Sequence, residues 1–112
     1  MARTASPALT DGEARLMNVL WKKRRATVAE VLTALPKKPA VAYNTVQTML
    51  RILEEKGHVR HEQDGPRYVY RPVVPRERAS RSALRRVVGT FFGDSVEDAM
   101  AALLELDDLD LS

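Results

Sequence analysis

The chain has 112 residues, of which 45% are hydrophobic and 29% are charged, as expected for one soluble globular domain with or without an appendage. It contains no cysteine, which excludes disulfides, thiolate zinc sites and thiolate catalysis. No apolar run approaches the roughly 20 residues needed to span a bilayer, and the first residues lack the apolar core of a signal peptide. We therefore expect a cytoplasmic protein with no membrane partner.

The net charge of +3 is unevenly distributed along the chain. Residues 1–74 contain 13 Lys and Arg against 7 Asp and Glu, whereas residues 75–112 contain 5 against 8. A basic first part followed by an acidic second part is typical of a nucleic-acid-binding module joined to a segment with another role. Basic charge alone does not decide this, because many solvated protein faces are basic.

Two capping boxes predict the first two helices, after a loose leader over residues 1–9. Thr10 and Glu13 form the first box, and Thr27 and Glu30 form the second, which follows a basic cluster over residues 22–25. Each box precedes an apolar stripe with helical spacing. The stripe residues are Leu16, Met17 and Leu20 in the first helix, and Val28, Val31, Leu32 and Leu35 in the second, which ends at Pro36.

The stretch from Ala42 to Gly57 predicts a third helix, which gives the order of a helix-turn-helix. Gly57 suits the position just after a helix end. The apolar stripe consists of Val46, Met49, Leu50 and Leu53, and the opposite face carries Asn44, Thr45, Gln47, Thr48 and Arg51. Such a polar face can enter a DNA major groove, where Asn and Gln pair with adenine and Arg pairs with guanine. An ordinary solvated surface helix explains this stretch equally well when it is taken alone.

After the third helix the periodicity changes from helical to alternating. Residues 58–63 and 67–72 predict two strands around a tight turn at Asp64-Gly65-Pro66. A hairpin directly after a recognition helix is the wing of a winged helix. Arg67 beside the tip is therefore the expected phosphate contact, with Arg60 or Arg71 as weaker candidates.

The two histidines do not predict a metal or catalytic site. His58 and His61 are three residues apart, which places them on opposite faces of a strand, and no constellation of acids or cysteines lies near them in the sequence. No combination of Ser, His and Asp and no pair of carboxylates indicates catalysis. We therefore expect no enzyme activity, no cofactor and no metal.

The last segment predicts two amphipathic helices separated by a break at Gly93-Asp94. Pro75 suits the first position of one helix, and Ser95 caps the other. The expected dimerisation residues on their apolar faces are Leu84, Val87, Val88, Phe91, Met100, Leu103 and Leu104. Pairing with a second copy would bury these faces. Folding back onto the chain's own winged helix is the alternative.

Several motifs together resemble the penicillinase repressor family, which includes the β-lactamase, methicillin-resistance and copper-responsive repressors. The matching motifs are Leu9-Thr10 with Glu13, Leu20-Trp21, Thr27-Val28-Ala29-Glu30-Val31, Asn44-Thr45-Val46-Gln47-Thr48-Met49-Leu50, Glu55-Lys56-Gly57, Tyr68-Val69-Tyr70 with Pro72, and Phe92-Gly93 with Ser95. The resemblance runs from about Leu9 to Leu104, and the run from Thr45 to Leu50 is its most specific part. It implies a homodimeric winged-helix repressor on a palindromic operator, often built from TACA/TGTA half-sites.

Two departures limit what this resemblance implies. The copper branch has a cysteine-rich tail that this chain lacks, so metal sensing by that route is excluded. In the antibiotic-responsive branch a signal-dependent protease cuts an Asn-Phe bond in the dimerisation segment, and the matching bond here is Ala102-Leu103. The resemblance therefore implies a protease as a further partner, while the residues at the matching bond are altered.

We therefore predict a mainly α fold with a small β-hairpin wing, in which a winged helix-turn-helix domain over residues 9–74 precedes a helical dimerisation segment over residues 75–112. The predicted function is sequence-specific repression of transcription by a homodimer on a palindromic operator in double-stranded DNA. The predicted DNA-binding residues are Ala42, Tyr43, Asn44, Thr45, Gln47, Thr48, Arg51 and Arg67. We expect base contacts from Tyr43, Asn44, Thr45 and Thr48, and a place at the groove edge or on phosphates for Gln47 and Arg51. The alternative is a winged-helix module for protein interaction or for non-specific nucleic-acid binding.

Overall fold

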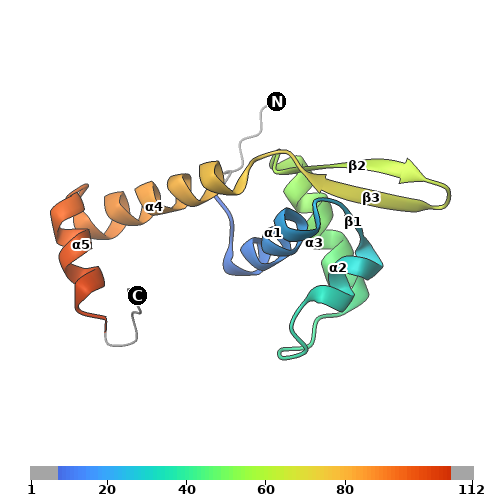
Figure 1. The fold of residues 1–112 in the computed structure, drawn as a ribbon, viewed down its shortest axis with the longest axis horizontal. Coiled ribbons are helices and arrows are strands. Elements are labelled where there is room, and N and C mark those ends of the chain that lie inside the picture. Colours follow the sequence, from blue (N-terminus) through green and yellow to red (C-terminus); the bar gives the residue numbers. More distant parts are fainter. Residues whose placement is uncertain (1–7, 107–112) are drawn as a thin grey trace. The chain divides into compact units, whose positions relative to one another are not determined.

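The computed structural model describes residues 8–106 of the chain (Figure 1). The elements in order are α1 (Asp11–Lys23), β1 (Ala26–Thr27), α2 (Val28–Ala34), α3 (Tyr43–Glu55), β2 (Val59–Asp64), β3 (Arg67–Pro72), α4 (Arg76–Phe92) and α5 (Val96–Leu104). This is the predicted mainly α fold with a small hairpin. Most of the expected leader, residues 1–7, and the end of the last segment, residues 107–112, lie outside the described range. The chain divides into two compact units, Met1–Arg78 and Ala79–Ser112.

Both predicted capping boxes are present, and they start α1 and α2. The Thr10 hydroxyl accepts from the Glu13 backbone N–H at 3.1 Å, and the Glu13 carboxylate accepts from the Thr10 N–H at 2.9 Å. The Thr27 and Glu30 pair repeats this geometry at 3.1 and 2.8 Å. Each box satisfies backbone donors that have no partner inside the helix. The sequence signal for these two helix starts is therefore confirmed.

The end of α3 at Gly57 is also confirmed. The Gly57 N–H donates to the Glu54 carbonyl at 3.0 Å, and the His58 N–H donates to the Leu53 carbonyl at 2.9 Å. These two bonds are the Schellman pair that closes a helix C-terminus. Gly57 has a φ of +88°, a conformation in which any side chain would be strained, so a glycine fits this position.

Three antiparallel strands form a sheet with the order β1-β3-β2. The first strand, β1, was not predicted from the sequence, and its two residues pair with Tyr70 and Val69 of β3. The hairpin turn is also one residue shorter than expected, because Asp64 pairs with Arg67 as part of the ladder. The loop is therefore Gly65-Pro66, and Gly65 has the positive φ, +63°, that a type II′ turn requires at its first loop position.

A single hydrophobic core joins α1, α2 and α3 to the sheet. Its largest fully buried side chains are Met17, Leu20, Val31, Val46, Leu50, Leu53 and Val59. An ion pair beside this core fixes α1 to the end of α3, since Lys56 Nζ lies 2.8 Å from Glu13 Oε1 and also donates to the Ala8 carbonyl at 3.1 Å. Trp21 Nε1 donates to the Val74 carbonyl at 3.0 Å, which ties α1 to the segment that follows β3.

The second unit contains the rest of α4, which begins in the first unit, and all of α5. The break between the two helices lies at Gly93-Asp94, as predicted, and the Ser95 hydroxyl caps α5 by accepting from the Asp98 N–H at 3.1 Å. Pro75 directly precedes α4 and is not its first residue, a difference of one position. The apolar faces of both helices are largely exposed in the single chain, with 61% of Leu84 and 76% of Phe91 accessible.

Candidate nucleic-acid interface

The outward face of α3 presents the hydrogen-bonding groups that the sequence analysis selected. Val46, Leu50 and Leu53 are buried, so the opposite side of the helix faces solvent. Asn44, Thr48 and Arg51 follow one another along this side at helical spacing, and all three are exposed. Their amide, hydroxyl and guanidinium groups have the donors and acceptors that read base edges.

The remaining predicted DNA contacts flank this row on its two sides. Thr45 lies beside a hollow of about 280 Å³ that α3 shares with α1 and with the loop after α2. Tyr43 is the first residue of α3, and 46% of it is exposed. Gln47, one turn after Tyr43, is exposed on the same side of the helix. The structure thus brings the predicted residues of α3 together as one exposed strip.

Ala42 occupies the N-cap position of α3, and its methyl group cannot accept a hydrogen bond. Its φ of −79° and ψ of 153° are nevertheless those of a normal N-cap residue. The first amide groups of the helix therefore have no side-chain acceptor at the end where base contacts are predicted. The helix begins at Tyr43, within one residue of the start expected from the sequence.

The hairpin is fixed to α3 by a contact that the sequence analysis did not predict. His61 Nδ1 on β2 lies 2.7 and 2.9 Å from the two carboxylate oxygens of Glu54 on α3. One carboxylate therefore lies beside His61, and nothing in the sequence indicated this contact. Glu54 is seven residues away across a helix end and a turn, and no periodicity predicts such a pair. With only these two groups, the contact is a hydrogen bond and not a metal site.

Aromatic rings extend this contact to β3. The His61 ring stacks on Tyr68 with a centroid distance of 4.3 Å and an interplanar angle of 21°, and lies 5.5 Å from the Tyr70 ring. Burial raises the pKa of the Tyr70 phenol above its ordinary value, and the negative charge of Glu54 adds to this effect. Glu54, His61 and the two tyrosines therefore form one cluster, which we call the wing-base cluster.

Arg67 lies directly after the hairpin loop and is exposed, as expected for a phosphate contact. Backbone hydrogen bonding from Thr27 lowers the pKa of the Glu30 carboxyl, with smaller contributions from the charges of Lys23 and Arg67. Arg71 is one of the weaker candidates for a phosphate contact, and its Nε lies 3.7 Å from Glu62 Oε2.

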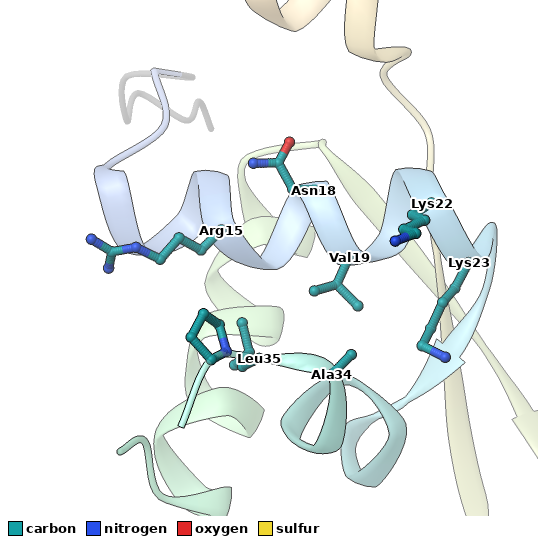
Figure 2. A pocket seen from close by; sticks show the side chains of 8 residues that line it. Arg15, Asn18, Val19, Lys22, Lys23, Ala34 and Leu35 are labelled. Carbon is teal, nitrogen blue, oxygen red and sulfur yellow. The ribbon is translucent and has the colours of Figure 1, made fainter. Parts of the chain in front are cut away.

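A groove of about 630 Å³ separates α1 from the end of α2 (Figure 2). Its lining residues are Arg15, Asn18, Val19, Lys22, Lys23, Ala34, Leu35 and Pro36. None of them carries a carboxylate, an imidazole or a hydroxyl group, so the two lysines have no partner in the lining with which to form a catalytic pair. Within residues 8–106, no three His, Cys, Asp or Glu side chains gather closely enough to hold a metal ion.

Three packed helices followed by a β-hairpin, with an exposed polar strip on the third helix, define the winged helix-turn-helix class of domain. The chain is similar to the solution structure of the DNA-binding domain of the repressor BlaI, with a TM-score of 0.58 and 32% sequence identity. That match covers 66% of this chain and 90% of the solved one. The family model for the penicillinase repressor matches residues 9–112, and the chain belongs to this family.

Two relatives show how far the similarity extends along the chain. A penicillinase repressor of Bacillus licheniformis is 28% identical over 103 residues, which cover 92% of this chain and 80% of the relative. An uncharacterised 16.5 kDa protein of Latilactobacillus sakei is 24% identical over 97 residues, which cover 87% of this chain and 66% of that protein. The family consists of DNA-binding transcriptional regulators and not of enzymes. In the described part of the chain, no helix is both long and apolar enough to cross a membrane.

Proposed function

We propose that this protein represses transcription as a homodimer on a palindromic DNA operator. The observation that carries the proposal is the exposed polar strip on α3, which contains no acid from Tyr43 to Arg51 and lies beside the hairpin. A recognition helix reads base edges in the major groove, while a wing holds the backbone. The proposal places the protein in the cytoplasm with its DNA.

The proposed base contacts come from the first two turns of α3. Asn44 would pair with adenine, Thr48 would contact a base edge or a thymine methyl group, and Tyr43 and Thr45 would flank them. Gln47 and Arg51 would reach the groove edge or the phosphates. Ala42 would bring the helix start close to the DNA, because a small residue there leaves room. Arg67 would bind a phosphate from the wing, which fixes position without reading sequence.

The proposed dimer would bury the apolar faces of α4 and α5. Seven residues would form the seam: Leu84, Val87, Val88, Phe91, Met100, Leu103 and Leu104. All except Val88 are exposed in the single chain, and Leu104 is 68% accessible. Apolar burial is worth about 25 cal/mol per Å², so covering these side chains with a second copy would favour association. A two-fold dimer would in turn match two inverted half-sites.

Replacing Leu84 by Asp tests this assembly. A carboxylate at that position would have to be buried in the seam without a partner, which is expensive. We expect the wild-type chain to be a dimer by light scattering at micromolar concentration and the Leu84→Asp variant to be mainly monomeric, with a steep loss of affinity for a palindromic operator. Ser82→Asp adds the same charge at an exposed position on the other side of α4 and should leave the dimer intact. A monomeric wild-type chain would contradict the proposal.

A further inference from the structure

The outer part of the hairpin is held at its base by the wing-base cluster. Every residue from Glu62 to Tyr68 is exposed, whereas His61 is partly buried and Tyr70 is only 5% accessible. His61 pairs with Tyr70 in the ladder, and Asp64 pairs with Arg67 three residues further out. At about 3.3 Å per residue, the tip lies roughly 10 Å beyond the His61 pair. A tilt of about 10° at that pair would therefore move Arg67 by almost 2 Å, more than a hydrogen bond to a phosphate tolerates.

Glu54 occupies the last turn of α3, only one turn beyond Arg51, where an unpaired carboxylate would repel a DNA backbone. Both of its oxygens instead face His61 Nδ1. The contact thus directs the negative charge of Glu54 toward the hairpin and connects the recognition helix to β2. The stacked Tyr68 ring carries the same restraint to β3, the strand that begins with Arg67.

We propose that His61 is a positioning residue for DNA binding, which holds the wing against the recognition helix through Glu54. The contact between His61 and Glu54, which we call the tie, sets the position of Arg67 relative to the exposed polar strip of α3. The phosphate contact of Arg67 and the base contacts of α3 can then form together. This inference rests on the proposed function, because it assigns to Arg67 a role on DNA. We expect His61 itself to contact neither bases nor phosphates.

Two variants remove the tie in different ways. Glu54→Ala removes the carboxylate, and His61→Phe keeps an aromatic ring beside Tyr68 but removes the nitrogen donor. Glu55→Ala is the matched control, because it removes the same charge from the neighbouring, exposed position of the same helix. Thermal unfolding of each variant shows whether the core remains intact.

The first measurement needs no DNA. Amide relaxation by NMR reports the order of the Gly65 N–H at the hairpin tip on the picosecond to nanosecond timescale. We expect the Gly65 order parameter to fall in Glu54→Ala and His61→Phe and to stay at the wild-type value in Glu55→Ala. Unchanged order at Gly65 in both tie variants would overturn the proposal, whatever the protein does on DNA.

The second measurement is a double-mutant cycle on operator DNA. Glu54→Ala and His61→Phe should each weaken binding several-fold, up to about tenfold, in the wild-type background and less than about twofold when Arg67 is already Ala. Equal losses in the two backgrounds would overturn the positioning role. If Arg67→Ala alone leaves affinity unchanged, the proposed phosphate contact fails. If Gly65 nevertheless becomes more mobile in Glu54→Ala and His61→Phe, the contact between His61 and Glu54 holds the hairpin but does not serve DNA binding. That result would also overturn the inference.

Discussion

The ion pair between Glu13 and Lys56 allows a sharp test of how α3 is held in place. Glu13 exposes 7% of its side chain and Lys56 exposes 15%, so both charges are largely withdrawn from water. In Glu13→Gln the amide oxygen can still accept from the Thr10 N–H, but the charge that faces Lys56 is lost. A hydrogen bond to a charged group contributes about 1.5–3 kcal/mol and a neutral one about 0.5–1.5 kcal/mol. The expected loss in the free energy of unfolding is therefore about 1–1.5 kcal/mol, or roughly 4–12 °C in Tm.

The second capping box provides a matched control. Glu30 makes the same backbone contacts with Thr27 that Glu13 makes with Thr10, and no ion pair to a lysine lies within the described contacts of Glu30. Glu30→Gln should therefore be less destabilising than Glu13→Gln in urea unfolding at pH 7. Equal losses in the two variants, or no loss in Glu13→Gln, would refute the role assigned to Lys56.

The same variant predicts a pH dependence. Burial by itself would raise the pKa of the Glu13 carboxyl, but hydrogen bonds from Lys56 and Thr10 and the Lys56 charge outweigh it and lower that pKa. A lowered pKa in the folded state means that Glu13 stabilises the fold fully above the unfolded value of about 4.3. This contribution is lost as the pH falls through the lowered value. The difference between wild type and Glu13→Gln should therefore shrink as the pH falls below about 4.3, and a difference that stays constant down to the onset of acid unfolding would contradict this assignment.

Two further predictions concern the ends of α3 and α5. Ala42→Ser places a hydroxyl at an N-cap of suitable geometry and should raise the free energy of unfolding, measured in urea, by about 1 kcal/mol. Ala40→Ser, which lies before the helix, should leave the free energy of unfolding unchanged. An Ala42→Ser variant with the wild-type free energy of unfolding would contradict this prediction. The Ala102-Leu103 bond lies in the last turn of α5, and a protease pocket built for an Asn amide would leave its polar groups unpaired against Ala102. Mass spectrometry of the protein from its native cells before and after β-lactam exposure should therefore show no fragment that ends at Ala102, and such a fragment appearing only after exposure would reject this prediction.

The local signals in the sequence predicted most of the helical structure correctly. Capping boxes at Thr10 and Thr27 and the glycine at position 57 act within a few residues of themselves, so their geometry follows from the local sequence. The apolar stripe of α3 likewise determined which side of the helix is buried and which side is exposed. The candidate DNA-binding residues on that helix could be selected because burial and exposure follow the helical period.

Contacts between distant segments could not be predicted in this way. β1 is only two residues long and exists because β3 supplies its hydrogen bonds, so no alternation of residues indicates it. The contact between His61 and Glu54 depends on how the hairpin leaves α3, which the Schellman turn at Gly57 sets. The bond from Trp21 to the Val74 carbonyl spans 53 residues and is likewise a product of the tertiary fold. The residues that position the wing therefore emerged only from the structure.

The central claim is that α3 contacts the bases while the wing contacts the phosphates, and salt-dependent DNA affinity tests it most directly. Binding of wild type, Thr48→Ala and Arg67→Ala should be measured on a palindromic operator and on random DNA over a range of salt concentrations, with Thr33→Ala on the exposed side of α2 as the matched control. We predict that the wild type prefers its operator by roughly 10³-fold or more at physiological salt. Thr48→Ala should lose about 1–3 kcal/mol on the operator and much less on random DNA. Arg67→Ala should weaken both alike and reduce the salt slope by about 1. A Thr48→Ala variant that loses affinity equally on both DNAs would contradict the account.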